Sequence, residues 1–278
     1  MIFKNIKLRH FLLFFAALLI AASGANDPTY AQENVAVENY PQPLLNHIAE
    51  WNKKQPAPEQ RPDTYIEIDQ RAYYDNIRLV KNELLVDKTK LMVVIKSDAY
   101  GHGLELLGNV AEIAGADYFG ITENHSLKTI NKMNLSRPIV RLRLASNNEL
   151  MMVHSNPDMY GDVEEMVGNI EMVQLLSKLG TEQDRIIKIH LNLNAGGMSR
   201  NGFDMGVAEI RNQLPSLSNL KNIQVVGIMT HFPNADATEL DETRTALANF
   251  KEQANWIIEN ANLNRANILL HVANTSTT

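Results

Sequence analysis

Short runs of β-branched and aromatic residues alternate with longer amphipathic stretches over most of this chain. The expected strands are Leu91–Lys96, Tyr118–Thr122, Ile139–Leu144, Met159–Val163, Ile186–Asn194, Val225–Phe232 and Ile268–Asn274, after a short candidate at Tyr65–Asp69. The expected helices are Arg71–Leu85, Leu104–Ala114, Val163–Leu179, Met205–Leu214 and Glu239–Asn260. Because strands that alternate with helices form parallel sheets through right-handed crossovers, the chain is predicted to be an α/β protein.

Six or seven such units in succession favour a (β/α)8-type TIM barrel over a doubly wound sheet. Some of the expected strands also carry polar residues on one side only. These residues are Lys188, His190, Asn192 and Asn194 on one strand, and Arg141 and Arg143 on another. In a barrel we expect them to point inward, with the last of them at the carboxyl-terminal mouth, where barrel active sites lie. An antiparallel sheet with one solvent-exposed face would explain the alternation equally well, but it would not explain the long helical connections.

The composition of the 278 residues excludes several classes of protein. Hydrophobic residues make up 45% of the chain and the net charge is only −6, so a core can form and disorder is not expected for most of the chain. Nucleic acid is not the expected partner, because phosphate binding needs a basic face. The chain has no cysteine, which excludes disulfides, a thiol nucleophile and cysteine-ligated metal.

Residues 1–31 are typical of a cleavable signal peptide. A basic segment with Lys4, Lys7 and Arg9 precedes the apolar run Phe11–Ala22, which is shorter than a membrane-spanning helix. Small residues follow, as a signal peptidase requires. We therefore expect a periplasmic or secreted protein that is not in the membrane after processing. The alternative is that the segment is retained as a membrane anchor.

Two further boundaries follow from composition. Residues 32–63 are polar and contain five prolines, which is typical of a linker or a lightly ordered arm. The strands and helices described above begin after this segment. The barrel domain is therefore expected over residues 64–278.

One short segment at the end of an expected strand carries most of the candidate chemistry. The apolar run Met92–Ile95 leads directly into Lys96, and Tyr100, Gly101 and Gly103 follow. An ammonium group is costly to bury without a partner, and burial favours the neutral amine, which can form a Schiff base. The glycines allow the loop to approach a bound group closely. The alternative is a lysine whose head simply reaches solvent at the barrel rim.

The segment Val94–Gly103, with the sequence VIKSDAYGHG, resembles the pyridoxal-phosphate lysine motif of the alanine racemases and of the related broad-specificity amino-acid racemases. Three further segments fit the same family in the same order. They are Asn194–Gly202 (NAGGMSRNG), Thr230–Phe232 with Asp236 just after it, and His271–Thr275 (HVANT). The resemblance covers the chain from about residue 65 to its end.

The resemblance implies a fold-type III pyridoxal-phosphate enzyme, an isomerase that interconverts L- and D-amino acids. Lys96 would hold pyridoxal 5′-phosphate as a Schiff base and would act as one of two bases, while the cofactor ring serves as the electron sink. Tyr100 and Thr275 would contact the phosphate group. The partner would be a small-molecule amino-acid substrate, and the full-length protein is expected to be a homodimer.

The resemblance assigns three more residues to the cofactor. His231 would sit beside the pyridine ring, and Asn274 would help to close the cofactor site. Arg200 would reach the phenolic oxygen of the cofactor and the carboxylate of the substrate, which suits the planar fork of a guanidinium group. No metal site is expected.

Three features favour the broad-specificity branch over an alanine-specific racemase. Alanine racemases commonly carry a lysine that becomes carbamylated shortly before the DTGMGR-like segment, but no lysine lies between His190 and Arg200 here. Asn194, together with Arg141 and Arg143 as substrate-binding residues, is more similar to the broad-specificity branch. The signal peptide points the same way, because ordinary alanine racemases are cytoplasmic.

The sequence ends at Thr278, just after its seventh expected strand. The family continues with an eighth strand and a carboxyl-terminal β domain, which carries the tyrosine that serves as second base in the partner subunit's active site. We therefore expect a barrel cut after its seventh strand and without that domain. The second base would be missing from this chain, and the chain alone would bind the cofactor poorly and racemise almost nothing.

Two functions of other classes fit parts of the pattern. A non-catalytic pyridoxal-phosphate-binding barrel would keep Lys96 but would need no second base. A barrel metallohydrolase would use His190, His231 and His271 near the strand ends, although the chain has no His-x-His pair on one strand.

Overall fold

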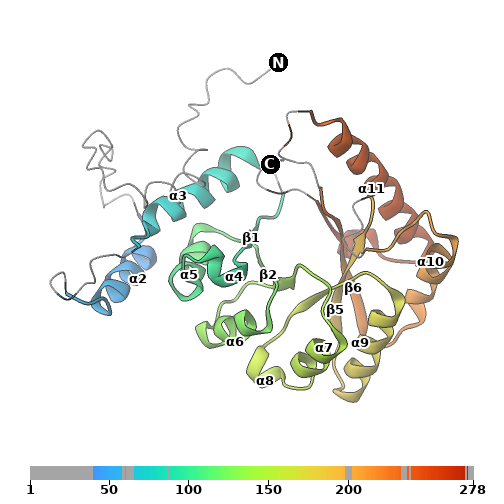
Figure 1. Ribbon diagram of the computed structural model, residues 1–278, viewed down its shortest axis with the longest axis horizontal. Coiled ribbons are helices and arrows are strands. Elements are labelled where there is room, and N and C mark those ends of the chain that lie inside the picture. Colours follow the sequence, from blue (N-terminus) through green and yellow to red (C-terminus); the bar gives the residue numbers. More distant parts are fainter. Residues whose placement is uncertain are drawn as a thin grey trace.

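Each strand in the described part of the chain pairs in parallel with the next one along the sequence. The computed structural model describes residues 40–57, 60, 66–86, 88–197, 202–232, 237, 239–272 and 274. Figure 1 shows that the sheet curls into a half-barrel with the helices outside it. The predicted α/β class and barrel architecture are confirmed. The strands, in the same order in the sheet as in the chain, are β1 (Met92–Val94), β2 (Tyr118–Ile121), β3 (Ile139–Arg141), β4 (Glu164–Val167), β5 (Ile187–Leu193), β6 (Ile223–Thr230) and β7 (Leu269–His271).

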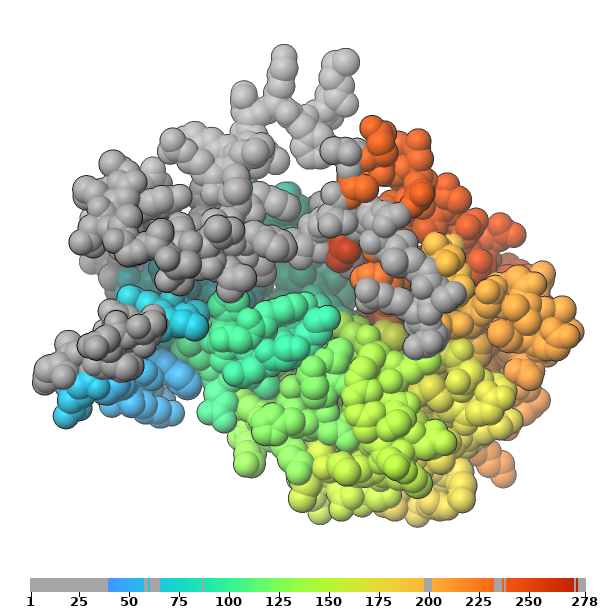
Figure 2. Space-filling view, viewed as in Figure 1, coloured from blue at the N-terminus to red at the C-terminus, as the bar shows by residue number. Residues whose placement is uncertain are grey.

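Helices connect the strands and precede the first of them. The part of the chain from α4 to α9, green to yellow-green in Figure 2, forms a continuous surface with a convex outline. The helices are α2 (Gln42–Lys53), α3 (Gln70–Leu79) with the π-turn η3 (Val80–Leu84), α4 (Lys96–Tyr100), α5 (Leu104–Ala114), α6 (Asn124–Met133), α7 (Asn147–His154), α8 (Pro157–Tyr160), α9 (Ile170–Glu182), α10 (Ala208–Gln213) with the 3-10 turn η4 (Leu214–Asn219), α11 (Asp241–Asn260) and η5 (Arg265–Asn267).

The core lies between the sheet and the helices. Ile189 of β5 shares a cluster with Val173 and Leu176 of α9, and all three are fully buried. Longer helices such as α5 and α9 contribute one apolar face each, as their sequence period requires. The bounds predicted for Leu104–Ala114 match α5, because the helix is apolar on the core side and ends at Gly115, which has φ +104°.

The fourth strand is where the expected and observed elements differ most. Met159–Val163 does not form a strand, because Pro157 starts the short helix α8, and proline is favoured in the first turn of a helix. The expected helix Val163–Leu179 begins later, as α9, where Asn169 accepts the backbone N–H of Met172 at 2.8 Å. The strand between them, β4, opens with two glutamates, which can be buried because both have cationic or imidazole partners.

Part of the predicted linker is folded against the barrel. Within residues 32–63, α2 packs on α5, with Leu44 fully buried and the Nε2 atom of His47 2.9 Å from a backbone carbonyl oxygen of α5. Residues 66–69 do not form the expected strand. Asp69 instead caps α3 by accepting two backbone N–H groups of its first turn.

The expected signal peptide lies within residues 1–39, outside the described residues. Among the residues that the structure describes, none of the helices combines the length and the apolar character needed to cross a membrane. Export therefore stays a prediction, as do the domain boundaries expected at residues 31 and 63.

Candidate active site at the carboxyl ends of the strands

Most of the predicted site residues lie just beyond the carboxyl ends of strands. Lys96 follows β1, Arg143 follows β3, Asn194 follows β5, His231 follows β6 and Asn274 follows β7. Because the strands are parallel, these ends lie along one rim of the half-barrel (Figure 1). This rim is the edge at which barrel enzymes assemble their active sites.

Two predicted cofactor residues, Arg200 and Thr275, lie outside the described residues. The segment around Arg200 comes after Asn194, whose Nδ2 atom donates to the carboxylate of Asp204 at 3.4 Å. The roles assigned to Arg200 and Thr275 by resemblance stay predictions.

Lys96 opens a left-handed turn. The four residues after it, Ser97–Tyr100, have φ values between 52° and 57°, so α4 has the opposite hand to the other helices. A left-handed conformation costs a residue with a side chain about 1–2 kcal/mol, so the turn must be held by other interactions. The sequence analysis expected the glycines to let the loop approach a bound group closely, but it did not expect non-glycine residues to adopt a left-handed conformation.

The strand that leads into Lys96 is less buried than its apolar sequence suggests. Residues 92–94 of β1 are partly buried, whereas Ile95 is fully buried. The reason is that β1 lies at an end of the sheet in the described residues, with a partner strand on one side only. Lys96 itself is partly buried, and its Nζ atom lies 5.7 Å from the centre of the Tyr100 ring.

The far end of the left-handed turn is fixed by Asp98. Its carboxylate accepts the backbone N–H of Leu104 at 2.7 Å, and its carbonyl oxygen accepts that of Gly103 at 2.9 Å. The Nδ1 atom of His102 lies 2.9 Å from the carbonyl oxygen of Ala99. These contacts join the turn to the start of α5.

The near end of the turn is held by Glu123, which follows β2 and which the sequence analysis missed. Its carboxylate accepts the backbone N–H of Ser97 and the hydroxyl of Ser126, each at 3.3 Å, and a short hydrogen bond from Thr122. Burial alone would raise the pKa of Glu123, but these hydrogen bonds hold that pKa below its ordinary value. Glu123 is therefore ionised at neutral pH. A glutamate directly after a strand is the sequence signal that could have identified it.

Tyr100 lies at the end of the turn and is 55% exposed. Its partial burial raises the pKa of the phenol above its ordinary value of 10. The hydroxyl is therefore protonated at neutral pH and available as a hydrogen-bond donor.

Arg143 is held on the rim by Glu149. One guanidinium nitrogen lies 3.0 Å from the carboxylate of Glu149 and 3.0 Å from the carbonyl oxygen of Leu144, and a second nitrogen forms a shorter bond to the same carboxylate. The hydrogen bond from Arg143 is the main reason that the pKa of Glu149 falls to about 2. Glu149 also closes a capping box with Ser146, so the arginine is anchored to the first turn of α7.

Arg141 does not point into the barrel, although the alternation of polar and apolar residues along this strand predicted that it would. It pairs in register with Ile121 and Glu165, on the side of the sheet that faces the helices. The Nε atom of Arg141 lies 2.8 Å from one oxygen of Glu165, Nη2 lies 3.1 Å from the other, and Nη1 contacts Asn124. Glu165 also contacts His154 of α7 at 3.1 Å. Because all three nitrogens of Arg141 are engaged in a fully buried position, the structure places this residue in the fold's interior.

A pair of histidines, His190 fully buried and His271 partly buried, lies inside the half-barrel. The Nε2 atom of His190 on β5 is 2.8 Å from the carboxylate of Glu164, and its Nδ1 atom is 2.9 Å from Nε2 of His271. Gly227 of β6 makes room for this contact, since a Cβ atom there would lie 2.0 Å from Nδ1 of His190. The inward direction predicted for His190 agrees with this position.

The metallohydrolase alternative draws no support from these histidines. His190 and His271 contact each other edge to face, with ring centres 4.9 Å apart. Within the described ranges, no group of three histidine, aspartate or glutamate side chains is arranged to hold a metal ion.

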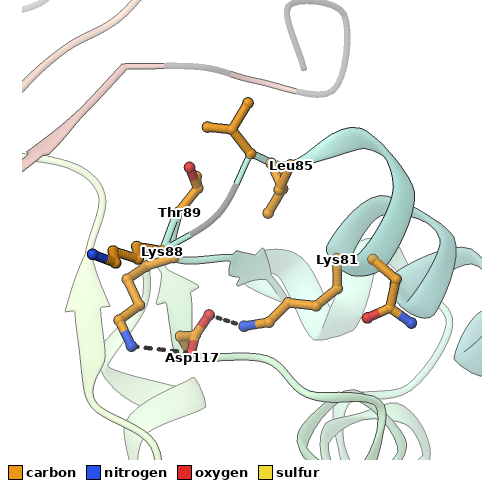
Figure 3. A pocket seen from close by; sticks show the side chains of 8 residues that line it. Lys81, Leu85, Lys88, Thr89 and Asp117 are labelled. Carbon is orange, nitrogen blue, oxygen red and sulfur yellow. Dashed lines mark hydrogen bonds and ion pairs between the residues drawn. The ribbon is translucent and has the colours of Figure 1, made fainter.

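Two pockets lie at the opposite rim from Lys96. One, of about 410 Å³, is formed where Lys81 and Lys90 meet Asp117, just before β1 and β2 begin (Figure 3). The other, of about 450 Å³, is lined by the first residues of β3, β4 and β5. Neither includes a predicted site residue, and the amino-terminal face of a barrel is the one that serves stability. We therefore place the candidate site at the carboxyl ends.

The chain is similar to several curated amino-acid racemases. A lysine racemase of Proteus mirabilis is 35% identical over 216 residues, which are 78% of this chain and 51% of that protein. A broad specificity amino-acid racemase of Vibrio parahaemolyticus is 34% identical over 218 residues, again 78% of this chain and 51% of that protein. The chain thus spans about half the length of the curated relatives it matches.

The solved structures show the same fold. An alanine racemase of Clostridium difficile 630 superposes with a TM-score of 0.64 at 24% identity, over 74% of this chain and 50% of that one. The family model for the alanine racemase N-terminal domain matches residues 68–278. Alanine racemases and the related racemases are pyridoxal 5′-phosphate enzymes. These matches, together with the parallel half-barrel, show that the chain belongs to the alanine racemase family. Residues 68–278 correspond to the N-terminal domain of that family.

Proposed function

We propose that this chain forms the lysine-bearing barrel of a pyridoxal-phosphate-dependent amino-acid racemase of broad specificity. The observation that carries the proposal is the position of Lys96, at the end of β1 and at the start of a strained left-handed turn. Backbone strain of this kind clusters at functional sites. The similarity to a lysine racemase and to broad specificity racemases supports the reaction class.

The residues of the rim fit pyridoxal 5′-phosphate. Lys96 offers a partly buried primary amine, and Tyr100 offers a protonated phenol that can donate to a phosphate oxygen. His231 and Asn274 lie at the ends of β6 and β7, on the same rim. The residues that would hold the cofactor are therefore Lys96, Tyr100, His231 and Asn274, with Arg200 and Thr275 from outside the described residues.

When bound, the cofactor withdraws electrons from the α-carbon of an amino acid, which makes the α-proton removable. The Nζ atom of Lys96 accepts this proton on one face of the α-carbon and can return it to that same face. Inversion needs a second proton donor on the opposite face. The curated relatives are about twice as long as the region they share with this chain, and we propose that the donor belongs to the part of them that is not matched.

The broad specificity rests on the absence of a lysine between His190 and Arg200 and on two rim residues. Arg143 presents a guanidinium group whose pKa is raised further, mainly by its hydrogen bond to Glu149, so its charge is permanent. Asn194 presents an amide at the end of β5. Both can contact the substrate without selecting for a methyl side chain. An alanine-specific racemase is the alternative within the family.

The test is exchange of the α-hydrogen in D2O, with the purified chain, pyridoxal phosphate and a panel of L-amino acids that includes lysine and alanine. We expect α-deuterium to appear in several of them without loss of optical purity, because Lys96 serves one face. Lys96→Ala should abolish the exchange. Lys178→Ala is the matched control, because Lys178 lies on the surface of α9 with its side chain 72% exposed.

Other outcomes separate the alternatives. Exchange restricted to alanine would favour the alanine-specific racemase. A bound cofactor without any exchange would favour a non-catalytic pyridoxal-phosphate-binding barrel. Interconversion of L and D forms at rates typical of enzymes, on the order of 10 s⁻¹, would mean that the second base is present in this chain. Tyr118 and Tyr160 are then the candidates.

A further inference from the structure

The peptide that joins Lys96 to Ser97 is fastened to the neighbouring strand. The N–H of this peptide, carried by Ser97, donates to the Oε2 atom of Glu123 at 3.3 Å, and the Oγ atom of Ser97 lies 3.5 Å from Oε1. Glu123 lies two residues after the end of β2, the strand beside β1. The orientation of a peptide plane sets the ψ angle of the residue before it, and therefore the direction in which the side chain of Lys96 leaves the rim.

The hydrogen bond between Ser97 and Glu123 differs from the hydrogen bonds farther along the turn in what it connects. The contacts of Asp98 and His102 bind the turn to itself and to α5, so they can move with it as one piece. The contact of Glu123 instead ties the turn to the sheet. Glu123 is itself held by the hydroxyl groups of Thr122 and Ser126, so its carboxylate is a fixed point.

We infer that Glu123 is a positioning residue, which orients the Lys96 amine by holding the Ser97 amide. This inference deepens the proposed function and rests on Lys96 being the lysine that reacts with pyridoxal phosphate. Four left-handed residues follow Lys96, and a chain in that conformation relaxes when a fastening is removed. Without the carboxylate, the turn would stay attached to α5, but the Lys96 side chain would lose its fixed direction.

The chain contains a matched control for this carboxylate. Glu112 accepts the backbone N–H of Ser136 at 2.8 Å and the hydroxyl of the same serine at 2.6 Å. It therefore clamps a serine as Glu123 does, and it also pairs with Arg137 at 3.8 Å, but it lies on α5 and its serine precedes β3, at the opposite rim. Glu123→Gln and Glu112→Gln remove the same charge from the same kind of serine clamp. Glu123→Asp keeps the charge and serves as the conservative variant.

The first measurement is hydrogen–deuterium exchange of the full chain without cofactor. We expect the Ser97 amide to exchange about tenfold faster in Glu123→Gln, the factor expected when one hydrogen bond to a charged group is lost. In Glu112→Gln the Ser97 amide should keep the parent rate. Equal Ser97 exchange in the parent and in Glu123→Gln would overturn the inference.

The second measurement is the site of pyridoxyl labelling after incubation with pyridoxal phosphate and borohydride reduction. We expect the share of label on Lys96, relative to other lysines, to fall about tenfold in Glu123→Gln and to recover in Glu123→Asp. A general loss of stability would lower this share in Glu112→Gln as well, so thermal unfolding of both variants is compared. Parent-like labelling of Lys96 in Glu123→Gln would overturn the role of Glu123 while leaving the proposed function standing. A parent chain that does not label at Lys96 would overturn the proposed function itself.

Discussion

Arg141 and Arg143 stand two residues apart, yet the fold gives them different surroundings. Arg141 is fully buried against Glu165, whereas Arg143 lies on the rim against Glu149, with its side chain 37% exposed. The alternation of side chains predicts one face for both, but β3 ends at Arg141, so the alternation does not extend to Arg143. A buried arginine is possible here because its carboxylate partner lies in register on the next strand.

Removing one partner of the buried pair should destabilise the chain strongly. We expect Arg141→Met or Glu165→Leu to lower the free energy of unfolding by about 3–5 kcal/mol, since each change removes one charge of a buried ion pair and leaves the other without its partner in that pair. The double variant Arg141→Met, Glu165→Leu should lose less than the sum of the two single changes. Urea unfolding of the four proteins measures this coupling. If the free energy of unfolding of the Arg141→Met chain lay within about 0.5 kcal/mol of the parent value, the buried ion pair would not stabilise the fold, because a change of that size is typical of an ordinary surface substitution.

The contact between His190 and His271 should make stability depend on pH. Burial, followed by the charge of His190, holds the pKa of His271 well below its ordinary value of 6.5. Below that pH the unfolded chain takes up a proton that the folded chain does not, so the contribution of His271 is complete above pH 6.5 and is lost as the pH falls. Relative to His271→Asn, the parent should lose up to about 1.4 kcal/mol of unfolding free energy per pH unit. Urea unfolding at several pH values between 5 and 7.5 tests this, and an identical slope in the variant would refute it.

At the scale of elements, the sequence predicted those whose stabilising interactions are local. Leu104–Ala114 matches α5 because apolar spacing and a terminal glycine are both visible in the sequence. The fourth strand was misplaced because Glu164 and Glu165 are polar in sequence but paired in the fold. The rim positions of Lys96 and His231 followed from the predicted parallel strands. The left-handed turn could not be predicted, because the contacts that hold it come from β2 and α5.

The left-handed turn should tolerate glycine where an ordinary helix does not. Ala99 has φ 52° and is 5% exposed, and Ala111 in α5 is fully buried in a right-handed helix. We expect Ala111→Gly to lower the free energy of unfolding by about 1 kcal/mol. Ala99→Gly should leave it unchanged or raise it by up to about 1 kcal/mol, because glycine pays no penalty for positive φ. Urea unfolding of both variants decides this, and equal losses would show that the turn is not left-handed in solution.

At the scale of the whole molecule, the chain is a parallel half-barrel whose candidate site residues lie along one rim. The alanine racemase N-terminal domain accounts for residues 68–278, and the matched relatives are about twice as long as the region they share with this chain. The barrel order could be predicted because consecutive parallel strands pair with each other. The partial exposure of β1 could not be predicted in this way, since it depends on what covers the ends of the sheet.

Export is the prediction that belongs to the whole chain. The basic and apolar pattern of residues 4–22 is typical of a signal peptide, and small residues follow it. We expect cell fractionation to find the protein outside the cytoplasm. N-terminal sequencing should show a mature chain that starts near Asn26 or Gln32. A cytoplasmic protein that retains Met1 would contradict export and would weaken the assignment to the broad-specificity branch.

The most direct test of the account is to find which lysine reacts with pyridoxal phosphate. The purified chain is incubated with the cofactor and reduced with borohydride, and its peptides are mapped by mass spectrometry. We predict that the pyridoxyl label lies on Lys96, at the end of β1 and ahead of the left-handed turn. The exposed Lys178 should react no more than any surface lysine. A label spread evenly over surface lysines, or concentrated on any lysine other than Lys96, would contradict the account.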